Sequence, residues 1–245
     1  MTDSAKKKFK LLPKDPSYLD GPKPRFTELL FAFDVFKEFI KGFRAFHFAG
    51  PYITVFGSAR FQEDHPYYKL TYEISKKISN LGFTILTGGG PGIMEAANKA
   101  AYENGGMSVG LNIILPQEQQ PNPYMHKWIL LKYFFVRKTL LIKYSYGFIV
   151  MPGGMGTMDE FFETLTLIQT KTIKNFPVVL IGKEYYKDID DLLNKMLEAK
   201  AISESDLKLI LITDNIDEAV QHIKNIINEN FIAKPAKARK ILFEN

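Results

Sequence analysis

The chain has 245 residues, of which 46% are hydrophobic and 24% charged, the composition of an ordinary globular protein with enough residues to bury a large core. It contains no cysteine, which excludes disulfides, thiolate metal sites and cysteine nucleophiles. Its four histidines lie far apart in the sequence, so we expect no metal centre and no other cofactor.

The net charge of +5 is concentrated at the two ends of the chain. Residues 1–25 carry +4, residues 231–245 carry +3, and the remainder carries −2. Nucleic-acid-binding domains usually carry a basic face on the fold itself, so solvated ends are favoured over nucleic-acid arms. No apolar run approaches the ~20 residues of a membrane span, and no apolar core follows the N-terminal lysines as in a signal peptide. We therefore expect a cytoplasmic protein without nucleic-acid or membrane partners.

Hydrophobic periodicity predicts an N-terminal helix followed by alternating strands and helices. Residues 1–25 are rich in proline and lysine and indicate an irregular arm, and residues 27–46 carry an aromatic stripe at helical spacing. Such a stripe usually packs on the parent domain or on a partner subunit. Strands are expected at 53–57, 83–87, 108–113, 129–135, 147–151, 177–182 and 209–213, and helices near 67–80, 92–104, 136–145, 157–171, 186–199 and 216–229.

This alternation predicts a Rossmann-like α/β fold, a three-layer αβα sandwich with a mostly parallel sheet of about seven strands. We divide the chain into an arm and helix (1–48), a nucleotide-binding domain (49–230) and a basic tail (231–245). The proline-rich segment 114–127 is expected to be a long loop, and long loops in compact domains are often functional.

Two predicted strands end in small-residue turns, where ligands bind in open parallel sheets. Gly57, Ser58 and Arg60 form the first turn, which is equally compatible with a simple tight turn. The second has glycines at 88, 89, 90 and 92, a costly composition that favours a special backbone conformation or close approach of a ligand. Its spacing matches neither G-x-G-x-x-G nor a Walker A loop. Glu95 follows one turn into the next helix, where it could contact a ribose or base, or interact with the helix dipole.

A third turn follows the strand predicted at 147–151. It comprises Pro152, Gly153, Gly154, Gly156 and Thr157, and the N–H groups that open the next helix suit a phosphate. Thr157 and Glu160 also match a capping box, in which Glu160 would be purely structural. Asp159 is expected to be a helix-start acid rather than a catalyst.

The predicted helix near 136–145 begins with the cations Arg137 and Lys138. Cations at a helix N-terminus oppose the helix dipole at roughly 0.3–1 kcal/mol each, although an exposed pair feels little of it. We therefore favour an anionic ligand or a carboxylate partner for these side chains, and arginine suits either because it can bind in a bidentate manner.

Taken together, these motifs resemble the LOG family, also described as "possible lysine decarboxylase" proteins. The resemblance covers roughly residues 50–230, and residues 110–124 are similar to its longer bacterial branch. The segments that carry it are VFGSAR (55–60), TGGGPGIMEAANKAA (87–101), FFVRKTLL (134–141) and PGGMGTMDE (152–160).

The resemblance implies a homodimer or larger assembly with active sites near the subunit interface. It also implies hydrolysis of the N-glycosidic bond of AMP or of a cytokinin riboside 5′-monophosphate, which gives free base and ribose 5-phosphate. The family's catalytic residues fall on Arg137 and Glu160, and the glycine-rich turns with Lys138 would bind the nucleotide. A carboxylate can stabilise the oxocarbenium charge or orient the attacking water, and we assign this task to Glu160. Arg137 would hold the phosphate or orient Glu160.

Three other functions compete with hydrolysis. A non-catalytic carrier of a nucleotide or of the molybdenum cofactor would use a related fold, although the pairing of Arg137 with Glu160 argues against it. A nucleic-acid binder would use the basic tails, and an NAD-dependent dehydrogenase would need a different glycine spacing. The base that is recognised stays open, with Met94, Tyr124 and Trp128 as possible stacking groups.

Overall fold

A computed structural model describes residues 21–46, 50–114 and 120–230, so the sequence predictions for the arm before residue 21 and for the tail after 230 lie outside the described residues. The described strands form a seven-stranded sheet in the order β4-β3-β2-β1-β5-β6-β7, with every neighbouring pair parallel. The predicted Rossmann-like architecture is confirmed. The strands are β1 (Tyr52–Phe56), β2 (Thr84–Thr87), β3 (Ser108–Ile113), β4 (Lys127–Leu131), β5 (Ser145–Val150), β6 (Val178–Ile181) and β7 (Ile210–Thr213).

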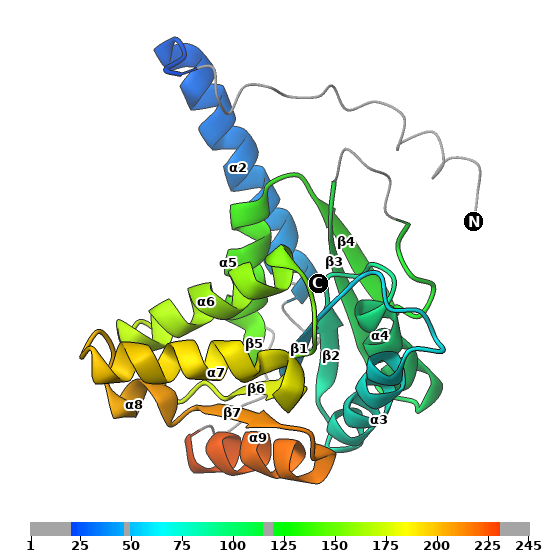
Figure 1. The fold of residues 1–245 in the computed structure, drawn as a ribbon. Helices are drawn as coiled ribbons and strands as arrows, with labels where there is room; N and C mark the ends of the chain where they lie inside the picture. Colours follow the sequence, from blue (N-terminus) through cyan, green and yellow to red (C-terminus); the bar gives the residue numbers. More distant parts are fainter. Residues whose placement is uncertain (1–20, 47–49, 115–119, 231–245) are drawn as a thin grey trace.

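Helices cover both faces of this sheet, as Figure 1 shows for α7 and α9 on either side of β6 and β7. One apolar cluster joins the sheet to α3, α4 and α9, and a second joins it to α2, α5, α6 and α7. The helices are α2 (Arg25–Phe46), α3 (Pro66–Asn80), α4 (Ile93–Glu103), α5 (Phe134–Tyr144), α6 (Met155–Gln169), α7 (Lys183–Glu198), α8 (Glu204–Leu207) and α9 (Ile216–Asn230).

Alternation along the strands divides the core between these two clusters. In β1, Ile53 and Val55 face the first cluster, while Tyr52 and Phe56 face the second. All four residues of β6 are fully buried, as expected for a strand covered on both faces.

The strand predicted at 129–135 is wrong at both ends, because β4 spans Lys127–Leu131. Tyr133 is the extended N-cap of α5, and Phe134 and Phe135 already belong to that helix. The aromatic residues at the start of α5 extend the apolar run of β4, so hydrophobicity alone could not show where the strand ends and the helix begins. Helix α6 likewise begins at Met155, two residues before the predicted start.

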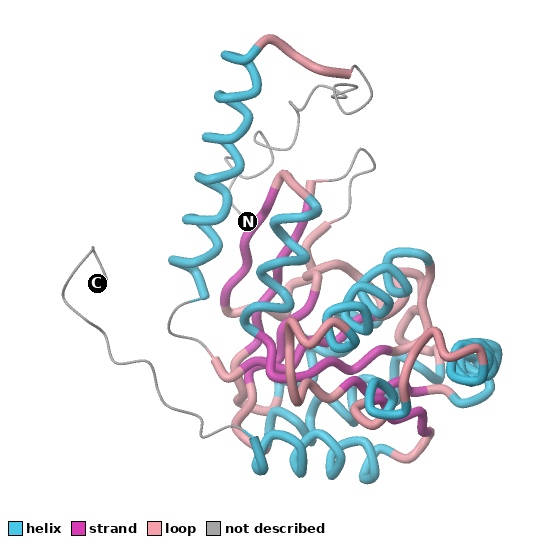
Figure 2. Tube along the Cα trace, turned by 90° about the vertical axis from the view of Figure 1, so that its left-hand side faces the viewer, coloured by secondary structure: helices cyan, strands magenta, loops and turns pink. Residues whose placement is uncertain are grey.

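The aromatic stripe of helix α2 is covered by the core only in the C-terminal half of the helix. Phe39, Phe43 and Phe46 pack on the core, whereas Leu29, Phe33 and Phe36 of the predicted stripe are exposed. The N-terminal half of the helix extends beyond the rest of the body in both views (Figures 1 and 2). No helix among the described residues is long and apolar enough to cross a membrane.

Candidate functional site

A cavity of about 680 Å³ opens at the carboxyl ends of the central strands. Here β1 lies beside β5, although β2, β3 and β4 come between them in the chain. The connection after β1 leads to one side of the sheet and the connection after β5 leads to the other. Such a switch point is where open α/β sheets bind ligands. The lining comes from the loops after β1, β2 and β5, the end of β3 and the helices α4 to α7, and comprises Phe56, Gly57, Ser58, Ala59, Arg60, Phe61, Gly88, Met94, Asn112, Ile113, Phe134, Arg137, Gly153, Gly154, Gly156, Thr157, Glu160 and Tyr185.

The N-terminus of α6 is open toward the cavity. Its N-cap is Gly154, and no side chain caps it. Among the described residues, no carbonyl partner accepts from the N–H groups of Met155 and Gly156, the first two positions of the helix. These donors, with the helix dipole and the nearby hydroxyl of Thr157, form a site suited to a phosphate.

The capping box suggested by Thr157 and Glu160 is wrong. Both residues lie inside α6, because the helix begins two residues before Thr157. The Thr157 hydroxyl instead lies so close to Gly153 that a Cβ there would meet it at 2.2 Å. Glu160 is therefore free of a capping role.

Glu160 is a buried carboxylate at the cavity wall. The residue is 4% exposed, and its Oε2 is buried with no hydrogen-bond partner. Burial raises the pKa of this carboxyl to about 7, and the opposing charges of Arg137 and Lys138 limit the rise. A carboxyl that titrates near neutrality can exchange protons with a reacting water.

Arg137 reaches the cavity from α5 and is held by one hydrogen bond. Its Nε donates to the carbonyl oxygen of Leu111 in β3 at 2.8 Å. Burial lowers the pKa of the guanidinium, while the charge of Glu160 opposes that change. Within the described residues, no ion pair joins Arg137 to Glu160. The neighbouring Lys138 instead forms ion pairs with two other carboxylates of α6. Both residues line the cavity, and each charge acts on the pKa of the other.

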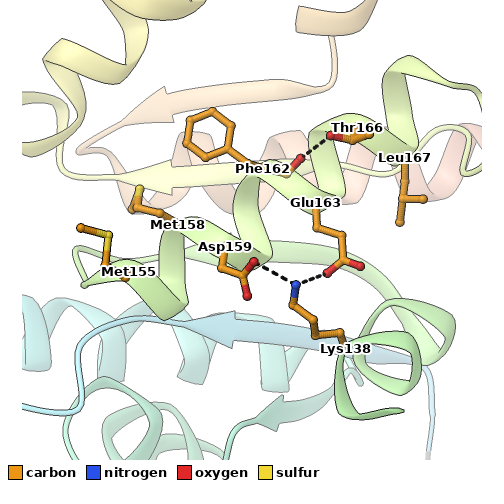
Figure 3. A pocket seen from close by; sticks show the side chains of 8 residues that line it. All are labelled: Lys138, Met155, Met158, Asp159, Phe162, Glu163, Thr166 and Leu167. Atoms are coloured by element: carbon orange, nitrogen blue, oxygen red, sulfur yellow. Dashed lines mark hydrogen bonds and ion pairs between the residues drawn. The ribbon is translucent and has the colours of Figure 1, made fainter. Parts of the chain in front are cut away.

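Lys138 does not line this cavity. Figure 3 shows its ammonium between two carboxylates of α6, and Nζ lies 2.9 Å from Oδ1 of Asp159 and 2.8 Å from Oε2 of Glu163. These residues line a separate, shallow hollow on the neighbouring surface. Lys138 therefore ties α5 to α6, and its predicted role in nucleotide binding stays a prediction.

Of the four glycines in the loop after β2, one lines the cavity. Gly88 lines it, and a Cβ at Gly88 would meet Nη2 of Arg137 at 2.1 Å. Gly92 is the N-cap of α4 with φ +69°, and a Cβ there would meet the carbonyl oxygen of Ser58 at 2.5 Å. Gly89 and Gly90 do not line the cavity either.

A buried hydrogen-bond network holds this loop in place. The amide of Asn122 donates to the carbonyl oxygen of Gly90 at 2.9 Å and to Oδ1 of Asn98 at 3.0 Å. The Thr87 hydroxyl donates to the same Oδ1 and accepts from the N–H of Gly89. The long loop predicted at 114–127 thus anchors the glycines through its described part.

The remaining turn residues are mainly structural. The N–H of Ser58 donates to the carbonyl oxygen of Pro152 at 3.0 Å, which joins the first and third turns. Pro152 does not line the cavity, whereas Gly57 and Ser58 do. Glu95 also lies outside the lining, and its Oε1 accepts from the Tyr68 hydroxyl at 3.2 Å.

Sequence reasoning did not single out several lining residues, among them three with a polar group or a large exposed ring. Asn112 near the end of β3 is a buried polar residue in an apolar strand, and that contrast was visible in SVGLNI. Tyr185 donates to the carbonyl oxygen of Gly153 at 2.8 Å, and Phe134 is half exposed at the cavity edge. Of the proposed stacking residues, Met94 lines the cavity and Tyr124 and Trp128 do not. No cluster of metal-ligating side chains occurs in the part of the chain that the structure describes.

Comparison with known proteins identifies the family. The profile of a family described as possible lysine decarboxylase matches residues 94–223, more than half of the chain. The chain belongs to this family. Its relatives include a cytokinin riboside 5′-monophosphate phosphoribohydrolase of Mycobacterium tuberculosis, 28% identical over 156 residues that cover 62% of this chain and 83% of the relative. A protein of the same name from Rhodococcoides fascians is 27% identical over 180 residues, which cover 71% and 89% of the two chains.

Solved structures share the fold at lower identity. The molybdenum cofactor binding protein of Rippkaea orientalis superimposes with a TM-score of 0.54 at 24% identity, over 73% of this chain and 98% of that chain. The molybdenum cofactor carrier protein of Chlamydomonas reinhardtii gives 0.53 at 23% identity, over 73% and 99%. At this identity the likeness establishes the Rossmann-like fold alone.

Proposed function

We propose that this protein is a nucleoside 5′-monophosphate phosphoribohydrolase, which hydrolyses the N-glycosidic bond of AMP or of a cytokinin riboside 5′-monophosphate to free base and ribose 5-phosphate. The observation that carries the proposal is Glu160, a buried carboxylate without a hydrogen-bond partner on the helix whose open N-terminus suits a phosphate. The names of the bacterial relatives support the same activity.

The geometry of α6 suits a nucleotide. Gly156 and Glu160 are four residues apart and lie on one face of the helix, about 6 Å apart along its axis. A phosphate bound at the N-terminus would therefore leave the ribose beside the carboxylate. Binding energy from the phosphate would help to position the bond that reacts.

The chemistry needs one water molecule and no redox step. As the bond between C1′ and the base nitrogen breaks, the base takes the electron pair and the ribose becomes oxocarbenium-like. Ionised Glu160 stabilises that charge and accepts a proton from the water whose oxygen bonds to C1′. The departing base takes up a proton from solvent, and Glu160 then releases its proton to solvent, so the sum is one water consumed. Arg137, across the cavity, binds oxygen atoms of the substrate and keeps Glu160 partly ionised at neutral pH.

The test is release of free base. The purified protein is incubated with AMP, other nucleoside monophosphates and N6-substituted AMP, and the products are separated by chromatography. We expect release by the wild type, loss in Glu160→Gln with AMP still bound, and retention in Asp159→Asn, since Asp159 is an exposed neighbour outside the cavity. AMP binding without base release from any substrate would instead favour the carrier function.

We also propose a homodimer or larger homo-oligomer. Six large apolar residues between Phe26 and Phe36 of α2 are each at least 42% exposed, a density that usually marks an interaction surface. Light scattering should give a mass above one chain, and Phe33→Asp with Phe36→Asp should lower it. A monomeric wild type would contradict this. The cytoplasmic location stays a prediction from the sequence.

A further inference from the structure

Asn112 is the second side chain of the cavity wall that has a buried polar atom without a partner, Glu160 being the first. The residue is only 5% exposed, and its Oδ1 accepts no hydrogen bond from the residues that the structure describes. Its Nδ2 makes no hydrogen bond among the described residues either, but unlike Oδ1 it is not fully buried, and the residue lines the cavity. An amide left unsatisfied in this way costs stability, which favours a role in binding a ligand.

The Asn112 side chain fits beside the loop after β2 only because residue 89 is a glycine. A Cβ at Gly89 would meet Oδ1 of Asn112 at 1.8 Å, and Gly89 has φ +71°. The preceding Gly88 gives Arg137 its space in the same manner. The two glycines therefore admit one side chain each from β3 and α5, and Oδ1 packs against the loop while Nδ2 is the atom left for the cavity.

Asn112 and the phosphate site lie at opposite ends of the cavity. The N-terminus of α6 follows β5, and Asn112 is near the end of β3, three strand positions away across β1 and β2. Adjacent strands are ~4.8 Å apart, so the strand ends are ~14 Å apart before the side chains reach inward. A nucleotide with its phosphate on α6 and its ribose beside Glu160 would extend its base toward Asn112.

We infer that Asn112 binds the nucleobase, its Nδ2 donating a hydrogen bond to a ring nitrogen of a purine. This inference rests on the proposed function for the placement of the phosphate. A donor at that nitrogen also stabilises the electron density that the base gains as its bond to C1′ breaks. Asn112 is thus a residue for base recognition and leaving-group stabilisation, distinct from the carboxylate that acts on the ribose side.

Calorimetric titration of the full chain tests the inference independently of turnover. The Glu160→Gln background prevents consumption of ligand, and Asn112→Leu in that background removes the amide with little change in shape. The ligands are AMP, its 1-deaza, 3-deaza and 7-deaza analogues, and ribose 5-phosphate. Each deaza analogue lacks one acceptor nitrogen of the purine ring, and ribose 5-phosphate lacks the base. We expect Asn112→Leu to weaken AMP binding about tenfold and to leave ribose 5-phosphate binding unchanged.

The deaza analogues identify the atom. The parent should bind one of them about tenfold more weakly than AMP, and Asn112→Leu should bind that analogue and AMP equally. Thermal unfolding of Asn112→Leu should show no loss of stability, because Oδ1 has no partner to be orphaned. Asn112→Asp serves as a second variant, which replaces the donor with an acceptor and should also weaken AMP.

Several results would overturn the inference. They are an equal loss for AMP and ribose 5-phosphate in Asn112→Leu, no loss for either, or a Glu160→Gln parent that binds all three deaza analogues as tightly as AMP. The Glu160→Gln parent could bind one deaza analogue more weakly than AMP while the wild type releases no base. That result would refute the proposed hydrolase but support base binding by Asn112.

Discussion

Replacing Glu160 by glutamine should stabilise the protein, and more so at high pH. The carboxyl has a pKa of about 7 in the folded protein against an ordinary value of 4.5. A raised pKa in an acid means that the folded state binds more protons than the unfolded state between these values. Stability is therefore lost as the pH rises from about 4.5 through 7.

The size of this effect follows from the pKa difference. At about 1.36 kcal/mol per pKa unit, ionised Glu160 costs about 3 kcal/mol at pH 8 and under about 1 kcal/mol at pH 5. Glutamine has no such titration, so the advantage of Glu160→Gln should grow by about 2 kcal/mol between the two pH values. For a chain of this size that corresponds to roughly 4–8 °C in melting temperature.

The assay is thermal unfolding of wild type and Glu160→Gln at pH 5 and pH 8. The difference between the two proteins at one pH cancels the other titrating groups, and comparing that difference at the two pH values cancels any pH-independent effect of the carboxamide. Asp159→Asn, a change of the same type at an exposed carboxylate, should show a much smaller pH-dependent difference. An equal melting-temperature difference at both pH values would refute the assignment of Glu160 as a buried carboxyl with a raised pKa.

Three further outcomes follow from the site. If ionised Glu160 is the active form, kcat/KM for AMP should rise with pH to a plateau with a midpoint near 7. Lys138→Met should move that midpoint upward, because the lysine lowers the pKa of Glu160. A kcat/KM that falls with pH through this range would contradict the role of Glu160 as a base. Gly88→Ala, at a residue without a left-handed φ, should fold normally but lose at least about tenfold in activity by displacing Arg137, as kinetics with a circular-dichroism control would show. Asn122→Ala should cost about 2–3 kcal/mol in denaturant unfolding because it orphans buried partners, and unchanged stability would contradict the importance of that network.

Alternation of strands and helices was enough to predict the architecture, because burial on two faces leaves a continuous apolar run in each central strand. It could not predict where β4 ends, since the aromatic residues of α5 continue the same run. The glycine-rich turns were placed correctly at the strand ends. The sequence did not show which of these glycines line the cavity, because that depends on how the turns pack together. Gly88 and Gly154 line it, whereas Gly89, Gly90 and Gly92 do not.

The sequence by itself determined the fold class and the family resemblance, because regular periodicity and short motifs are local properties of the chain. The catalytic roles of Arg137 and Glu160 stay a prediction. Only the tertiary structure decided what surrounds each charge. Arg137 and Lys138 are adjacent in sequence, yet one faces the cavity and the other binds two carboxylates outside it. The burial that raises the pKa of Glu160 and leaves Asn112 without a partner depends on packing between distant segments, and no local pattern in the sequence encodes it.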